Sequence, residues 1–126
     1  MASAREFGIL LHPSSLPGAH GIGDLGPSAY AFADWLHASG GRVWQILPLV
    51  PPGAGNSPYS SWSAFSCNPL LISLETLSND GLLPHVERVS SYSGQRVDFD
   101  EVARLKLERL NFAAKILLSD IEHPRY

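Results

Sequence analysis

The feature that most constrains the fold is a strand, a helix and a second strand predicted near the start of the chain. Residues 8–12 (Gly-Ile-Leu-Leu-His) and 43–47 (Val-Trp-Gln-Ile-Leu) are short apolar runs, each followed by a proline, and both are typical of buried strands. The helix predicted between them covers residues 27–39. Such a unit nearly always contains two parallel strands joined by a right-handed crossover. We therefore predict an α/β fold that opens with a βαβ unit.

The predicted helix at residues 27–39 has signals at both ends. Pro27 suits the first helical position because its missing N–H is not needed there, and Gly40 and Gly41 favour the left-handed conformation that ends helices. Between these ends, apolar residues recur with the spacing of one helical face, and we expect this face to be buried. Its members are Ala29, Phe32, Ala33 and Leu36.

A long loop, residues 48–69, is expected to follow the second strand. It is rich in serine and proline, yet it carries Tyr59, Trp62 and Phe65 at intervals of three. Long loops without helix or strand are uncommon unless they bind something or are disordered, and disordered segments contain few aromatic residues. An ordered binding loop is therefore the better interpretation. It leaves the carboxyl end of a parallel strand, where α/β enzymes hold their substrates.

The aromatic residues of this loop allow two interpretations. Trp62 and Phe65 are expected to anchor the loop to the core. Tyr59 instead lies among small hydroxyl residues, and its ring could cover the C–H face of a sugar, since tyrosine combines an apolar ring with a polar tip. The neighbouring side chains that could hydrogen-bond sugar hydroxyls are Asn56, Ser57 and Ser60.

The second half of the chain contains one clear helix, predicted at residues 99–118. Asp98 and Glu101 have the spacing of a capping box with aspartate as the cap. Further apolar residues surround its main apolar face, so we expect this helix to be buried by more than one neighbour. That face is predicted to comprise Ala103, Leu107, Leu110, Ala114 and Leu117. Before this helix we expect an apolar run at residues 70–74 and a broken helical turn at residues 77–83.

Composition argues against several classes of protein. The chain has 126 residues and a formal net charge of −3, the size of one ordinary domain. Its nine Lys and Arg residues are scattered, so no nucleic-acid partner is expected. No apolar run approaches the roughly 20 residues of a membrane helix, so no membrane partner is expected either. The first residues lack the apolar core of a signal peptide and Cys67 is the single cysteine, which favours a cytoplasmic location.

Patterns typical of other active sites are incomplete. Residues 21–26 match the G-x-G-x-x-G dinucleotide motif, but the motif does not follow its strand closely and no acidic residue ends the second strand. Nucleotide binding therefore survives only if this motif proves to follow a strand directly. The five histidines lack the spacing of a zinc site, so no metal is expected. His12 lies at a predicted strand end, where enzymes place functional groups, but it is interpreted as a satisfied structural histidine. Cys67 is interpreted as a buried or half-buried bystander, and Asp24 as favourable to the dipole of the following helix.

Three blocks of sequence resemble, in the same order, the N-terminal part of 4-α-glucanotransferases (amylomaltases, or disproportionating enzymes). The blocks are residues 8–18 (GILLHPSSLPG), 41–49 (GRVWQILPL) and 57–72 (SPYSSWSAFSCNPLLI). Val97, Asp98 and Phe99, before the last helix, are also similar to that family. Cys67 departs from the pattern, since a small residue such as glycine is expected there.

The resemblance implies a (β/α)₈ TIM barrel, of which this chain is the opening βαβ part, because a whole barrel takes at least about 200 residues. It implies transfer of α-1,4-glucan segments to the 4-hydroxyl of glucose or a maltooligosaccharide, without a cofactor. The implied mechanism is retaining and uses an Asp nucleophile, a Glu acid/base and a further Asp.

The site residues implied by the resemblance are few. The family's catalytic carboxylates match nothing in residues 1–126, so we predict no catalytic residue here and an inactive isolated chain. Tyr59, in the Ser-Pro-Tyr motif, is implied to pack against the donor sugar, with Asn56 and Ser57 shaping the same pocket. The alternative is a non-catalytic glucan-binding or scaffold domain that reuses the motif, which would have to fold alone.

Overall fold

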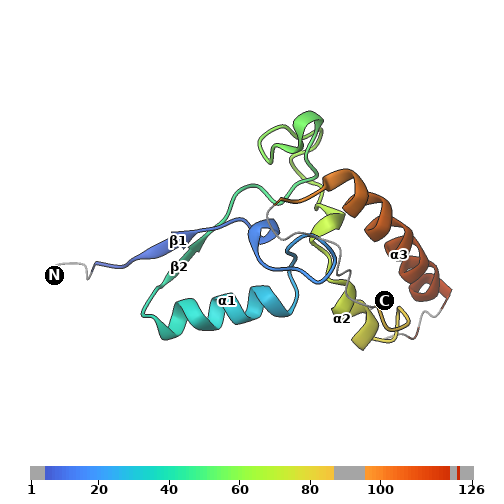
Figure 1. Cartoon of the computed structure of the whole chain (residues 1–126), viewed down its shortest axis with the longest axis horizontal. Helices are drawn as coiled ribbons and strands as arrows, with labels where there is room; N and C mark the ends of the chain where they lie inside the picture. Colours follow the sequence, from blue (N-terminus) through green and yellow to red (C-terminus); the bar gives the residue numbers. More distant parts are fainter. Residues whose placement is uncertain (1–4, 87–95, 120–121, 123–126) are drawn as a thin grey trace.

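The computed structural model describes residues 5–86, 96–119 and 122. A strand, a helix and a second strand come first, followed by the long loop and the helices of the second half (Figure 1). The strands are β1 (Gly8–Leu10) and β2 (Val43–Gln45), and the α-helices are α1 (Pro27–Ala38), α2 (Leu74–Asn79) and α3 (Phe99–Ser119). Three 3-10 helices lie between them: η1 (Pro13–Ser15), η2 (Ala54–Asn56) and η3 (Pro69–Leu71). Within the described ranges, no helix combines the length and the apolar character that crossing a bilayer requires.

β1 and β2 pair in parallel and are connected through α1, so the predicted βαβ unit is confirmed (Figure 1). The register begins with Gly8 opposite Val43. A Cβ atom on Gly8 would lie 2.3 Å from the Val43 carbonyl oxygen, so the close approach of the strands requires glycine there. Past the end of the ladder, the Trp44 indole N–H donates to the Leu11 carbonyl oxygen at 2.8 Å, which ties the two strands together again.

The strands are shorter and more exposed than predicted. Each has three residues, and Leu10 is 56% exposed, Val43 48% and Ile46 42%. The prediction of two buried strands is therefore wrong for the described part of this chain. The physical reason is that the sheet has two strands there and no further strand to cover its edges or faces. An apolar run indicates that its side chains favour burial, but they are buried only where another element packs against them.

α1 begins at Pro27 and ends before the two glycines, as predicted. Gly40 has a φ of +83°, the left-handed conformation in which glycine ends a helix without strain. Ala29 and Leu36 from the predicted face are buried, whereas Ala33 is exposed. The buried stripe of α1 is therefore narrower than its apolar spacing predicts.

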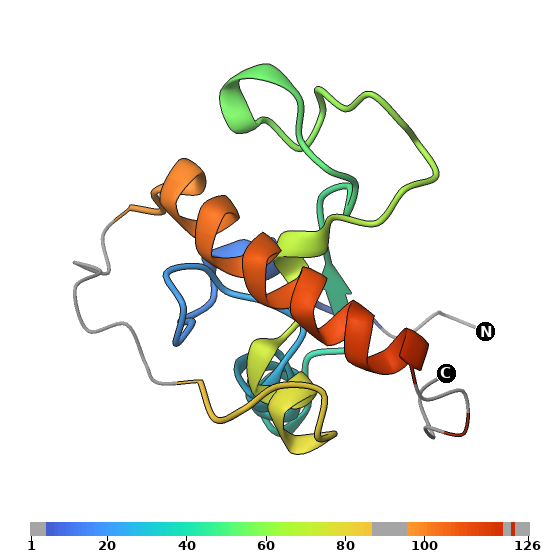
Figure 2. The ribbon, with the colours of Figure 1, turned by 90° about the vertical axis from the view of Figure 1, so that its right-hand side faces the viewer.

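The hydrophobic core lies against α3 rather than beneath the strands. One cluster joins α2, the turn after it and α3, and it comprises Leu74, Leu82, Leu83 and Ala113. A second cluster joins the glycine-rich loop, η3 and α3, and it comprises Ile22, Leu70 and Val102. α3 therefore runs across η3 and α2 and holds both in place, as Figure 2 shows.

α3 is confirmed close to its predicted bounds, and its predicted face is confirmed in part, because Ala103, Leu110 and Leu117 pack against the two core clusters. Asp98 caps the helix as predicted, because its Oδ1 accepts a hydrogen bond from the Glu101 N–H at 3.1 Å. Leu107 and Ala114, from the predicted face, are exposed. The buried residues are Val102, Lys106 and Ala113. The buried stripe is therefore displaced to one side of the predicted face, and the apolar pattern misses that displacement because a lysine occupies part of the stripe.

The other predictions for the second half hold in part. α3 packs against more than one neighbour, η3 and α2, as expected, but Phe112 and Ile116 on its other sides are exposed. The expected run at 70–74 and helical turn at 77–83 are replaced by η3 and α2, which begins earlier. Ser73 accounts for that start, since its Oγ accepts a hydrogen bond from the Thr76 N–H at 3.2 Å and caps α2.

Candidate functional site

The loop at residues 48–69 projects from the body of the molecule and is closed at its base (Figures 1 and 2). At the base, the Asn68 N–H donates to the Leu49 carbonyl oxygen at 2.9 Å. Farther out, Ser61 Oγ donates to the Pro51 carbonyl oxygen at 2.7 Å. These bonds join the outgoing and returning halves of the loop, which supports its interpretation as an ordered loop.

The tip of the loop brings together the three residues predicted to contact a sugar. Gly55 and Asn56 both have left-handed backbone conformations, with φ of +79° and +55°. Ser57 Oγ accepts a hydrogen bond from the Tyr59 N–H at 3.3 Å, and its carbonyl oxygen accepts one from the Ser60 N–H at 3.0 Å. Asn56, Ser57 and Tyr59 therefore belong to one tight turn, with their side chains close along the chain.

All three aromatic rings of this loop are exposed. Tyr59 is 73% exposed, Trp62 91% and Phe65 98%. The prediction that Trp62 and Phe65 anchor the loop to the core is therefore wrong for this chain. Serine hydroxyls and backbone groups within the loop hold its shape instead, so it needs no aromatic anchor. The Tyr59 ring is accessible to a ligand.

Other candidate residues have structural roles. His12 Nδ1 accepts a hydrogen bond from the Ser14 N–H at 3.3 Å and caps η1. The prediction of a satisfied histidine holds only in part, because its buried Nε2 has no hydrogen-bond partner among the described residues. Cys67 is a free, exposed thiol, so the prediction of a buried or half-buried side chain is wrong. η1 separates β1 from the glycine motif at residues 21–26, so the condition for a nucleotide site is not met. Within the part of the chain that the structure describes, no three potential ligands could hold a metal ion.

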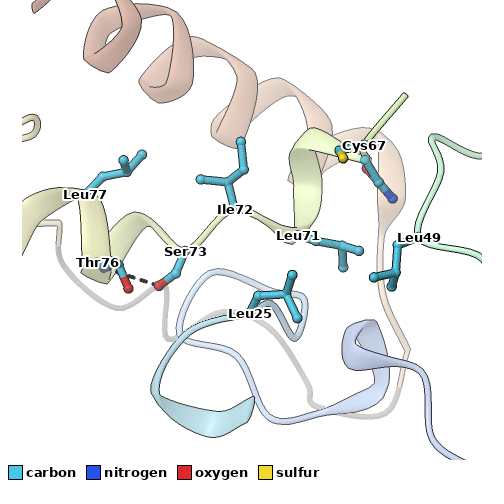
Figure 3. A pocket seen from close by; sticks show the side chains of 9 residues that line it. Leu25, Leu49, Cys67, Leu71, Ile72, Ser73, Thr76 and Leu77 are labelled. Atoms are coloured by element: carbon cyan, nitrogen blue, oxygen red, sulfur yellow. Dashed lines mark hydrogen bonds between the residues drawn. The ribbon is translucent and has the colours of Figure 1, made fainter. Parts of the chain in front are cut away.

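An apolar hollow of about 310 Å³ lies at the base of the loop, between the loop and α2 (Figure 3). Leu49 and Cys67 line it from the two ends of the loop, and Leu25 lines it from the glycine-rich segment. Leu71 and Ile72 complete its apolar wall. Because this lining offers few partners to hydroxyl groups, the loop tip is better suited to bind a sugar.

The site also contains a buried ion pair that sequence reasoning missed. Lys106 Nζ lies 2.9 Å from Asp24 Oδ2 and 2.8 Å from the Leu70 carbonyl oxygen. The Lys106 side chain is 0% exposed and that of Asp24 13%. Burial lowers the pKa of Lys106, while the adjacent Asp24 carboxylate acts in the opposite direction. In the sequence, Lys106 lies four positions after Val102 and so on the same face of the predicted helix, which could have indicated a buried lysine. Nothing in the sequence indicated that Asp24 is its partner.

Known proteins provide an independent test of the resemblance. A family model described as 4-alpha-glucanotransferase matches residues 11–124. The chain belongs to this family.

The 4-α-glucanotransferase relatives include proteins from plants and bacteria. The chain is 52% identical over 119 residues to the chloroplastic/amyloplastic 4-alpha-glucanotransferase of Solanum tuberosum, covering 91% of this chain and 21% of that protein. It is 45% identical over 124 residues to the 4-alpha-glucanotransferase of Synechocystis, covering 97% and 25%. The chain therefore spans about a fifth to a quarter of the length of these relatives.

A solved amylomaltase has the same fold over nearly all of this chain. It is the amylomaltase from Streptococcus agalactiae in complex with acarbose, which is 36% identical with a TM-score of 0.86. The match covers 97% of this chain and 25% of that one. The predicted fold class, the opening part of a (β/α)₈ barrel that is incomplete in this chain, is therefore confirmed.

Proposed function

We propose that this chain is the N-terminal segment of a 4-α-glucanotransferase and supplies one wall of its donor-sugar site. The observation that carries the proposal is the family match over residues 11–124, which includes the loop with Tyr59 at its tip. The intact enzyme transfers segments of α-1,4-glucans to the 4-hydroxyl of glucose or a maltooligosaccharide. We keep a cytoplasmic location as a prediction, noting that plant relatives are described as chloroplastic/amyloplastic.

The chemistry of the loop tip supports a sugar contact. The exposed Tyr59 ring offers an apolar surface for the C–H face of a glucose unit, and its hydroxyl can hydrogen-bond at the edge. Asn56 and Ser57, in the same turn, offer an amide and a hydroxyl to the sugar hydroxyls. The S. agalactiae relative is described with acarbose bound, which agrees with this class of ligand.

The catalytic carboxylates are proposed to lie outside residues 1–126. Retaining transfer needs two carboxyl groups about 5–5.5 Å apart, one as nucleophile and one as acid/base. The family's catalytic carboxylates match nothing in these residues, and of the twelve Asp and Glu residues in the chain Asp24 is paired with Lys106 and Glu101 with Arg104. The proposed role of this chain is therefore to bind the donor sugar and not to carry out the chemistry.

A disproportionation assay on maltotriose tests this proposal. We expect activity from the intact enzyme and none from the isolated chain. In the intact enzyme, Tyr59→Ala should lower kcat/KM at least about tenfold, or roughly 1.4 kcal/mol of barrier. Tyr59→Phe keeps the ring and should lose less. Tyr30→Ala is a matched control, since Tyr30 is 68% exposed but lies on α1.

Three outcomes would contradict the proposal. Activity of the isolated chain would place catalytic groups within it. An unchanged kcat/KM for Tyr59→Ala would remove Tyr59 from the donor site. A cooperative melt of the isolated chain that maltooligosaccharide shifts upward, together with an inactive intact protein, would favour the non-catalytic glucan-binding alternative.

A further inference from the structure

The loop that carries Tyr59 is oriented by its base. Within the part of the chain that the structure describes, the hydrogen bonds of residues 51–65 are all made to other residues of the same segment. They fix the shape of the loop but do not connect it to the body. Its direction relative to the body therefore depends on Leu49 and on residues 68–71, where the loop returns.

Asn68 joins the two ends of the loop at this base. Its N–H donates to the Leu49 carbonyl oxygen at 2.9 Å, and its Oδ1 accepts from the Leu70 N–H at 3.0 Å. Asn68 is 8% exposed, so these bonds are shielded from water. A displacement of Leu70 would accordingly be passed to both ends of the loop.

Lys106 connects that base to α3. Its Nζ donates to the Leu70 carbonyl oxygen at 2.8 Å and to Asp24 Oδ2 at 2.9 Å. Asp24 is held in turn by the Gly26 N–H, which donates to its Oδ1 at 3.1 Å. A charged donor forms a stronger hydrogen bond than a neutral one, and a fully buried one exchanges little with water.

We propose that Lys106 is a positioning residue: through the Leu70 carbonyl oxygen and Asn68 it sets the orientation of the loop at residues 48–69, and hence the place of Tyr59. This inference rests on the proposed function, because it assigns Lys106 to the same donor-sugar site without any contact between Lys106 and the sugar. Asp24 serves as the fixed counter-charge that keeps the ammonium group directed at η3.

The test separates positioning from stability with a paired variant of the intact enzyme. Lys106→Met alone leaves the Asp24 carboxylate buried without its cationic partner, so this variant changes both the stability and the position of the loop. Lys106→Met with Asp24→Asn removes both charges, keeps similar volumes and retains an acceptor for the Gly26 N–H. We expect this double variant to melt near the wild type, yet to lose kcat/KM for maltotriose about tenfold, a factor that corresponds to about 1.4 kcal/mol. The loss should fall mainly on KM, since ground-state binding is weakened.

A control variant and a double-mutant cycle complete the experiment. Lys115→Met removes an exposed lysine from the same helix and should leave kcat/KM unchanged. Adding Tyr59→Ala to the double variant should cost much less than the two separate losses combined, because both changes act on one contact. If the double variant fails to fold, Asn68→Ala removes the Oδ1 acceptor of the Leu70 N–H while it keeps the backbone bond to Leu49 and the ion pair, and it should reproduce the loss in kcat/KM.

Each remaining outcome overturns a specific claim. Full kcat/KM in a folded double variant or in Asn68→Ala, with Tyr59→Ala impaired, overturns the positioning role and leaves the proposed function intact. Fully additive losses in kcat/KM would show that Lys106 does not act through Tyr59. That result would also overturn the positioning role. An unimpaired Tyr59→Ala overturns the donor-site assignment and the positioning role with it.

Discussion

Lys106 shows how a single residue can be both costly and necessary. Removing an ammonium group from water costs several kcal/mol, and in this molecule Asp24 and the Leu70 carbonyl oxygen offset that cost. The pair stabilises the fold only while both charges are present. The two acceptors of Lys106 also favour one register of α3 against η3, because a shift of the helix would leave the ammonium group buried without them.

His20 leads to a prediction about pH. The residue is 4% exposed, and burial, followed by the positive charge of Lys106, lowers its pKa below the ordinary value of 6.5. As the pH falls below 6.5, the unfolded state binds a proton that the folded state does not, so the free energy of unfolding must decrease. Glu75 and Asp24 oppose this shift and Arg109 reinforces it.

The measurement is urea unfolding of the intact enzyme between pH 7.5 and pH 5. His20→Gln should lose less stability on acidification than the wild type. His85→Gln, which replaces an exposed histidine, should behave like the wild type. Equal losses for the wild type and His20→Gln would show that His20 does not contribute.

For single residues, the sequence predicts contacts between neighbouring positions in the chain but not contacts between distant positions. Asn56, Ser57 and Tyr59 lie within four consecutive positions, so a single turn necessarily brings them together, and Ser-Pro-Tyr is readable as a motif. Asp24 and Lys106 are 82 positions apart, and each has an ordinary local explanation, one as a helix-dipole partner and the other as a surface lysine. Only tertiary packing reveals that they meet.

Among the elements, helix ends follow from local chemistry whereas buried faces do not. Pro27 and Asp98 mark the starts of α1 and α3, because a missing N–H or a capping carboxylate acts within one turn. Which face of a helix is buried depends on the elements that pack against it. α3 turns Leu107 outward and Lys106 inward, since Asp24 and Leu70 lie on that side.

The cap of α3 gives a prediction for this element. Asp98→Ala removes the acceptor of the Glu101 N–H, and we expect a loss of about 1 kcal/mol in the free energy of unfolding. Asp98→Asn keeps a capping oxygen and should lose only a few tenths of that. The intact enzyme should show this difference in urea unfolding at neutral pH. An equal loss in the free energy of unfolding for the two variants would show that Asp98 does not stabilise α3 as a cap.

The whole molecule has more exposed apolar surface than its composition requires. The sheet faces and the loop contribute Leu10, Val43, Ile46 and Phe65, each more than 40% exposed. Large exposed apolar surfaces normally contact another part of a protein. The apolar runs at residues 8–12 and 43–47 predict buried side chains, and Phe65 is expected to anchor the loop, but the described part of this chain does not bury these residues.

This surface predicts the behaviour of the isolated 126-residue chain. We expect it to bind the dye ANS and to self-associate at micromolar concentration, and we expect neither from the intact enzyme. Size-exclusion chromatography with light scattering provides the measurement. The pair Leu10→Ser and Val43→Thr should reduce association of the isolated chain. A monomeric isolated chain without dye binding would contradict the prediction.

The contact between Lys106 and Leu70 also sets an order of events during synthesis. A ribosome releases Asp24 and Leu70 well before Lys106, because the chain emerges from its N-terminus. Until α3 has formed and docked, the Leu70 carbonyl and the Asp24 carboxylate remain hydrated, and the base of the loop has no support from the body. The loop at residues 48–69 is thus synthesised well before α3, yet its base gains support from the body only after α3 has docked.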